Sequence, residues 1–156
     1  MARLARIASL ATLLLAAVAL TACGGDNTQK NQYIDQLTGA QLRFASTQKR
    51  FEADATKSAS ARQNSRALTR FATAIADTVT ALRRIEAPPK VAAEHRRFVS
   101  VFETWHADVA RFAAAIRNPT PRAFEAARRR IDAATQTFNR SSRDAATQIE
   151  TKLESV

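Results

Sequence analysis

Apolar residues recur every three or four positions along most of the chain after residue 30, and polar or charged residues separate them. In an α-helix this spacing gathers the apolar side chains on one face, so the pattern predicts a series of amphipathic helices. We expect four of them, at about residues 29–56, 61–87, 89–117 and 121–153. The most regular apolar face belongs to the third helix, and it consists of Val91, His95, Phe98, Phe102, Trp105, Val109, Phe112 and Ile116.

Local signals mark where these helices begin and end. Ser60 and Gln63 have the spacing of a capping box, which predicts the start of the second helix. Pro88 predicts its end, because a residue that precedes a proline is disfavoured in the α region. Thr120 followed by Pro121 is typical of an N-cap and a first helical position, so the fourth helix is expected to begin there.

Long helices joined by short connections pack antiparallel in chain order. We therefore predict an all-α fold, an up-down-up-down antiparallel four-helix bundle over residues 31–156. All three glycines lie within the first 39 residues, so the rest of the chain lacks the glycine turns typical of antiparallel sheets. A long two-helix hairpin that dimerises would show the same periodicity, and it stays open as the alternative fold.

The first 22 residues have a different pattern. Arg3 and Arg6 precede an apolar run from Ile7 to Leu20, which is the layout of a secretory signal peptide. As a helix this run would span roughly 21 Å, too short to cross a hydrocarbon core of ~30 Å. We expect residues 1–22 to be a cleaved signal peptide.

The segment Leu20-Thr21-Ala22-Cys23 resembles the bacterial lipobox, in which an aliphatic residue and two small residues precede a cysteine. The resemblance implies cleavage before Cys23 and attachment of a diacylglyceryl group to its sulfur, usually with a further acyl chain such as palmitate on the new amine. Residues 23–30 would then form the lipidated cysteine and a short tether. The protein would be exported and anchored to the outer face of the bacterial cell membrane, or to the outer membrane of a cell with two.

The remaining part of the chain resembles alanine- and arginine-rich helical-bundle lipoproteins, a resemblance that implies no particular activity. The residue chemistry does not indicate an enzyme either. The single cysteine is expected to carry lipid, and it excludes an internal disulfide. The serines lack the G-x-S-x-G motif of a nucleophile elbow. We therefore predict a non-enzymatic protein.

Metal and haem sites are not expected. Glu103 and His106 have the Glu-x-x-His spacing of di-iron bundles, but the chain holds no second copy of that motif. His95 and His106 are three helical turns apart, ~16 Å, so they would not ligate one haem iron from opposite sides. We predict no cofactor and no metal.

His95 and Trp105 are the two apolar-face positions that could serve a ligand. His95 is expected in the core or at its edge, hydrogen-bonded to a neighbour such as Tyr33, and the alternative is a ligand contact or a pH-sensitive switch. Trp105 is expected to fill the centre of the bundle, and the alternative is a ligand-facing ring. These alternatives support a second hypothesis, in which the protein carries a small ligand or cofactor in a pocket near His95 and Trp105.

The chain has 24 basic and 14 acidic side chains, a formal net charge of +10. Its basic residues occur on every predicted helix outside the apolar faces, without interleaved exposed aromatics, so nucleic acid is not an expected partner. Arginine far exceeds lysine, which GC-rich codon usage produces without selection for binding. The functional interpretation is that Arg83, Arg84, Arg96 and Arg97 lie at the membrane-proximal end and attract anionic lipid or an envelope polymer.

The first hypothesis on function follows from the anchor and the charge together. The protein would be a lipid-anchored helical interaction module that presents one face to another envelope protein or to an anionic polymer.

Overall fold

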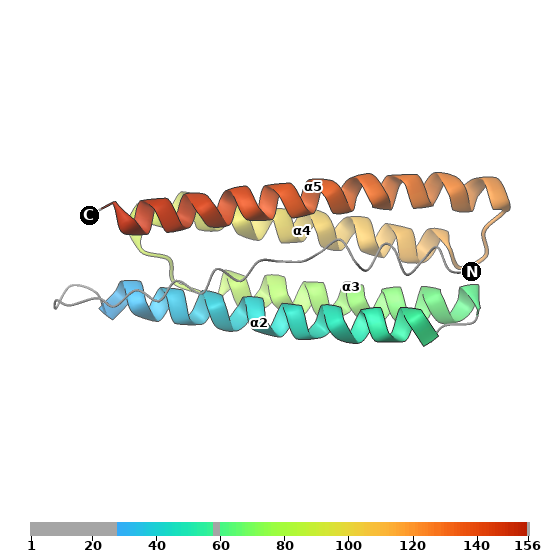
Figure 1. The fold of residues 1–156 in the computed structure, drawn as a ribbon, viewed down its shortest axis with the longest axis horizontal. Helices are drawn as coiled ribbons and strands as arrows, with labels where there is room; N and C mark the ends of the chain where they lie inside the picture. Colours follow the sequence, from blue (N-terminus) through green and yellow to red (C-terminus); the bar gives the residue numbers. More distant parts are fainter. Residues whose placement is uncertain (1–27, 58–59, 156) are drawn as a thin grey trace.

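The computed structural model describes residues 28–57 and 60–155 and shows an all-α four-helix bundle, as the periodicity predicts (Figure 1). The helices are α2 (Thr28–Lys57), α3 (Ala61–Arg83), α4 (Ala92–Ala115) and α5 (Pro121–Glu154), and a 3₁₀ turn, η1 (Pro89–Val91), precedes α4. No strand occurs in these described ranges. Cys23 and the whole of residues 1–27 lie outside the described part of the chain.

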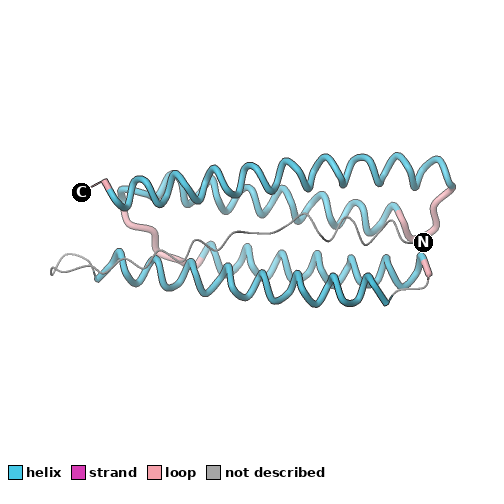
Figure 2. The backbone as a smooth tube through the Cα atoms, viewed as in Figure 1, coloured by secondary structure: helices cyan, strands magenta, loops and turns pink. Residues whose placement is uncertain are grey.

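The helices alternate in direction along one common axis, and short connections join them (Figure 2). Pairs that are consecutive in the chain pack against each other, α2 on α3, α3 on α4 and α4 on α5. One chain thus supplies all four helices of the bundle, whereas the alternative fold needed a second copy of a two-helix hairpin.

The predicted start signals are present. The Ser60 hydroxyl accepts a hydrogen bond from the Gln63 backbone N–H, and the Gln63 side chain accepts one from the Ser60 N–H, which completes the capping box at α3. The Thr120 hydroxyl accepts from the Ala123 N–H at 3.2 Å and caps α5. Each cap satisfies a backbone donor that the first helical turn leaves without a partner.

Three boundaries differ from the prediction. The helix α4 begins at Ala92 and not at residue 89, because Pro89–Val91 form the 3₁₀ turn η1. The helix α2 begins at Thr28, so it includes the last residues of the segment expected to be the tether. The helix α3 ends at Arg83 although apolar spacing continued to residue 87. Ile85 explains the difference, because its side chain packs into the core while its backbone is already in the turn that leads to Pro88.

Aromatic rings join the four helices at the middle of the bundle. Phe44 of α2 lies edge-on to Phe102 of α4, with ring centroids 5.1 Å apart, and close to Phe138 of α5. Phe71 of α3 stacks beside Phe44 at 6.2 Å. Burial of each such side chain stabilises the fold by roughly 1.5–3 kcal/mol, so this layer of rings holds the four helices in one core.

Candidate functional site

We call the end of the bundle where α2 begins and α5 ends the base, and the opposite end, with the α2–α3 and α4–α5 connections, the tip (Figure 1). Each end includes the ten residues of every helix that are nearest to it, together with the connections between those helices. The base comprises residues 28–37, 74–101 and 145–154, and the tip comprises residues 48–70 and 106–130.

His95 lies in the core of the base, with 5% of its surface exposed. Its Nε2 lies 3.0 Å from the Leu82 carbonyl oxygen, and its Nδ1 lies 3.2 Å from the Tyr33 hydroxyl. A carbonyl oxygen only accepts, so Nε2 carries the proton and the Tyr33 hydroxyl donates to Nδ1. Burial lowers the pKa of His95 below its usual value, which favours the neutral ring. The Tyr33 contact is the one that the sequence suggested, and it occupies both ring nitrogens within the protein.

Glu94 lies beside this pair on α4. Burial, and then the negative charge of Glu94, raise the pKa of Tyr33 well above its ordinary value, so the phenol stays protonated. Lys152 of α5 lies 2.7 Å from Glu94, and this hydrogen bond is the main cause that lowers the pKa of the Glu94 carboxyl. The base is thus joined across α2, α4 and α5 by polar contacts that surround an otherwise apolar core.

Trp105 is almost fully buried and stacks on Phe138 of α5, with ring centroids 5.2 Å apart. It also lines a shallow cleft of about 210 Å³ between α4 and α5. The cleft is formed by Val101, Thr104, Trp105, Asp108, Ala134, Thr137, Phe138 and Ser141. His95 is not among these residues, so the structure does not bring His95 and Trp105 to one cleft.

The four arginines expected near the membrane do lie at the base. Arg83 forms an ion pair with Glu103 at 2.7 Å, and Arg97 donates a hydrogen bond to the Gln148 side chain. Arg84 and Arg96 are exposed to solvent. Seven basic and six acidic side chains share the base, so its net charge is close to zero.

The tip has a strong positive excess instead. Its described side chains include eleven basic and four acidic ones. The basic side chains are Lys49, Arg50, Arg62, Arg66, Arg70, Arg111, Arg117, Arg122, Arg128, Arg129 and Arg130. Three arginines form ion pairs, Arg70 with Asp54, Arg111 with Asp108, and Arg128 with Glu125. The other eight make no ion pair within the described residues.

Two of these unpaired arginines occupy positions that weaken the helices. Arg62 and Arg122 are each the second residue of a helix, α3 and α5, and neither helix has an acidic residue in its first turn. A helix N-terminus carries partial positive charge, so a cation there destabilises the helix by about 0.3–1 kcal/mol at low ionic strength. Their placement therefore does not serve the stability of the bundle.

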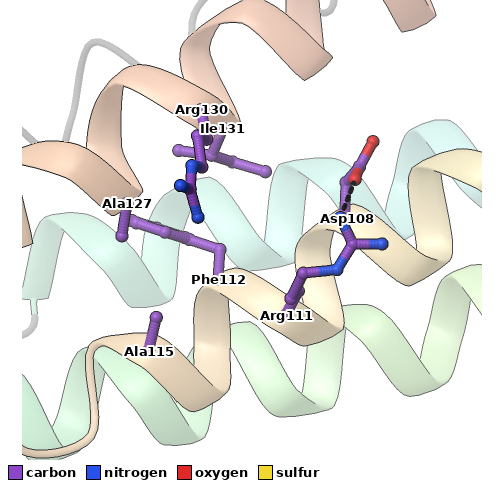
Figure 3. Close-up of a pocket in the computed structure, with 7 residues that line it drawn as sticks. All are labelled: Asp108, Arg111, Phe112, Ala115, Ala127, Arg130 and Ile131. Atoms are coloured by element: carbon purple, nitrogen blue, oxygen red, sulfur yellow. Dashed lines mark hydrogen bonds and ion pairs between the residues drawn. The ribbon is translucent and has the colours of Figure 1, made fainter.

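A second cleft of about 240 Å³ lies at the tip between α4 and α5. Phe112, Ala115, Ala127 and Ile131 supply its apolar lining, and Asp108, Arg111 and Arg130 supply its polar lining. Figure 3 shows Arg130 reaching from α5 toward Phe112 while Arg111 of α4 turns to Asp108. Ligand pockets usually enclose about 300–1,000 Å³, so this cleft is smaller than a usual ligand pocket and has room only for a small group beside Arg130.

The other candidate groups are placed as follows. Glu103 of the Glu-x-x-His motif is held by Arg83, and His106 is partly exposed three residues further along. Across the described ranges, no three His, Cys, Asp or Glu side chains lie together in a way that could hold a metal ion. None of the described helices is long and apolar enough to cross a membrane.

Comparisons with known proteins give no relative of this chain: no family model, no curated protein and no solved structure matches it. The residues and their geometry therefore carry the functional argument. The feature that sequence reasoning missed is the charge excess of the tip. The antiparallel topology already placed Arg128–Arg130 toward the tip. The difference in net charge between the two ends also depends on how the acidic residues are divided between them.

Proposed function

We propose that the protein is a lipid-anchored bacterial envelope protein whose four-helix bundle is a non-enzymatic interaction module. The proposal depends on Cys23, which the lipobox resemblance makes the lipid attachment site. Two or three acyl chains, each stabilised by about 0.8 kcal/mol per buried CH₂, anchor a protein effectively irreversibly.

The single observation that carries the proposal is the short distance along the chain between Cys23 and the bundle. The helix α2 begins at Thr28, only a few residues after Cys23. At a maximum of ~3.5 Å per residue the intervening chain reaches less than about 20 Å. A lipid on Cys23 would therefore hold the base at the membrane. The tip would then stand off by the length of the bundle, ~50 Å for the 34 residues of α5.

The polar groups of the core support a binding role for the outer surface. The Ser65 hydroxyl donates to the Ala113 carbonyl, the Thr135 hydroxyl donates to the Ile131 carbonyl, and His95 bonds Tyr33 and Leu82. These buried groups serve packing between or within helices. The surface that remains for a partner is polar, and it is basic at the tip, which fits an anionic envelope polymer or an envelope protein with an acidic face.

A carrier of a small ligand is the alternative function, and the cleft beside Trp105 is the observation that favours it. Its volume of about 210 Å³ is below that of usual ligand pockets. His95 would take no part in that site, because Tyr33 and Leu82 already occupy its ring nitrogens.

Crosslinking in intact cells tests the interaction module. A photo-reactive residue would replace Arg122 at the tip, Arg96 at the base or Leu42 on the outer face of α2, all exposed positions. We expect discrete crosslinked species from at least one of these positions in the wild-type background, and their loss in the Cys23→Ser background. Identical labelling with and without Cys23 would contradict a function that depends on membrane anchoring.

A further inference from the structure

The strongest unexplained feature of the molecule is the unequal division of charge between its ends. The tip carries eleven basic and four acidic described side chains, whereas the base carries seven and six. Composition bias acts on the whole chain and explains abundant arginine, but it does not explain why the tip holds four more basic and two fewer acidic described side chains than the base. An interaction at the tip explains the division.

The ion pairs of the tip leave most of this charge available. Arg70, Arg111 and Arg128 hold Asp54, Asp108 and Glu125. Eight basic side chains of the tip then make no ion pair in the described structure. They are Lys49, Arg50, Arg62, Arg66, Arg117, Arg122, Arg129 and Arg130. All eight are exposed, and they come from the tip ends of α2, α3 and α5 and from the α4–α5 connection.

The placement of these charges opposes stability. Like charges crowd together, and Arg62 and Arg122 lie at helix N-termini, where an acidic residue is the stabilising choice. A bound anion would remove both penalties at once. The bundle is therefore expected to become more stable when a polyanion binds to the tip. Replacement of tip arginines by acidic residues is expected to stabilise the bundle in the absence of a polyanion.

The chemistry of the surface selects the kind of anion. Guanidinium groups bind both phosphate and carboxylate groups through paired hydrogen bonds, and several exposed arginines at one end of the bundle suit a chain with repeated negative charges. A protein interface usually has an apolar core, yet Leu42, on α2 outside the tip, is the one strongly exposed large apolar side chain among the described residues. The membrane that would hold Cys23 is also far from the tip, ~50 Å away against a screening length of about 8 Å.

We propose that the tip of the bundle, through Arg62, Arg66, Arg122, Arg129 and Arg130, binds a phosphate-rich polyanion. Arg130 of this surface also lines the cleft at Phe112, as Figure 3 shows. The inference names the partner class of the proposed interaction module and rests on that proposal for its place in the cell. Binding itself requires only the folded tip.

The experiment measures binding of inorganic polyphosphate to the full chain, purified from membranes in a non-ionic detergent, across a salt series. The test variant replaces Arg62, Arg66, Arg122 and Arg129 with glutamine. The matched control replaces Arg83, Arg84, Arg96 and Arg97 with glutamine, which removes the same charge from the base. We expect the tip variant to bind at least about tenfold more weakly, with a salt slope lower by about 3, since each lost phosphate contact contributes ~0.7 to the slope. The control is expected to change binding by less than about threefold, because more distant charges are screened.

Equal losses from the two variants would overturn the proposal, because the charge would then act only in bulk. No binding of polyphosphate by the wild-type chain would overturn it as well. Equal binding of poly-glutamate would overturn the choice of phosphate and indicate an acidic polypeptide, and preferential binding of anionic vesicles would indicate a membrane.

A double variant separates an effect on polyphosphate binding from an effect on folding. Arg62→Glu and Arg122→Glu place acids at the two helix N-termini, so the double variant should have a higher midpoint of thermal unfolding and weaker polyphosphate binding. A lower midpoint together with weaker binding would mean that these arginines serve the fold, and would contradict the proposal. Cys23→Ser distinguishes this inference from the proposed function, because loss of anchoring with unchanged polyphosphate binding keeps the tip site and removes only the membrane role.

Discussion

The Tyr33 hydroxyl lies 3.2 Å from Nδ1 of His95, across the core and 62 residues away in the sequence. Because Nε2 of the same ring donates to the Leu82 carbonyl, the pair fixes one tautomer of His95 and ties α2, α3 and α4 together at the base. The ring centroids are 5.5 Å apart in an edge-on arrangement, so the contact combines a hydrogen bond with aromatic packing. A polar residue on an apolar face thus has a structural role here.

Replacement of Tyr33 by phenylalanine keeps the ring and removes only the donor to Nδ1. An unsatisfied buried acceptor is expected to lower the free energy of unfolding by about 1–3 kcal/mol. Urea unfolding at pH 8 measures the change, and Tyr33→Leu, which also removes the aromatic contact, should cost more. A Tyr33→Phe protein as stable as wild type would show that the hydrogen bond contributes nothing.

His95 also predicts a pH dependence of stability. Its pKa is lowered in the folded protein, so the unfolded chain binds a proton more readily than the native state. The contribution of the neutral His95 ring to stability is therefore complete at pH values above its unfolded-state pKa of about 6.5. It is lost as the pH falls toward the lower pKa of the folded state. We expect urea unfolding to show falling stability below that pH, and a flatter profile over the same window in His95→Gln. The neighbouring Glu94 titrates at lower pH, because Lys152 lowers its pKa, and Tyr33 stays protonated throughout. Parallel profiles for the two proteins would contradict this account of His95.

Phe102 is the residue whose change should damage the core most clearly. Its side chain is almost fully buried and contacts the rings of Phe44, Phe98 and Phe138. Phe102→Asp buries a carboxylate without a partner and removes these contacts, so a loss of several kcal/mol is expected, about 4 or more. Leu42→Asp is the control, because Leu42 is 51% exposed and its change should stay within about 0.5 kcal/mol. Similar effects of the two substitutions on chemical denaturation would refute the assigned core.

Thr120 tests the start of α5. Its hydroxyl accepts from the Ala123 N–H, so Thr120→Ala should cost about 1 kcal/mol, whereas Thr120→Ser should be close to neutral. Thermal unfolding of the three proteins checks the order. An equal loss from serine and alanine would show that the methyl group, and not the cap, matters at this position.

The helices, their caps and the core could be predicted because each depends on short-range spacing. Tyr33 and His95 could be paired because an antiparallel topology places both at the base. The end of α3 could not be predicted, because Ile85 continues the apolar pattern after the helix has ended. Spacing alone does not distinguish a helical residue from a core residue in a turn.

The difference in charge between the two ends also could not be predicted from the spacing of apolar and polar residues. Arg83 and Arg97 looked like free cations in the sequence, but Glu103 and Gln148 engage them in the fold. The attraction of these base arginines to anionic lipid stays a prediction, and the six acidic residues of the base make the expected binding weak. Glutamine at Arg83, Arg84, Arg96 and Arg97 should change vesicle binding only modestly, in a co-sedimentation assay with anionic and neutral vesicles. Complete loss of binding would show that the base arginines act despite their acidic neighbours.

The central claim is that Cys23 carries the lipid that holds this bundle at a membrane. The most direct test is the mass of the N-terminal proteolytic fragment of the protein extracted from cell membranes, beside the same fragment from the Cys23→Ser variant. The account predicts a fragment that begins at Cys23 and carries the added mass of a diacylglyceryl group, with or without a further acyl chain, and no such fragment from the variant. A wild-type fragment that retains residues 1–22, or that begins at residue 23 without added lipid mass, would contradict it.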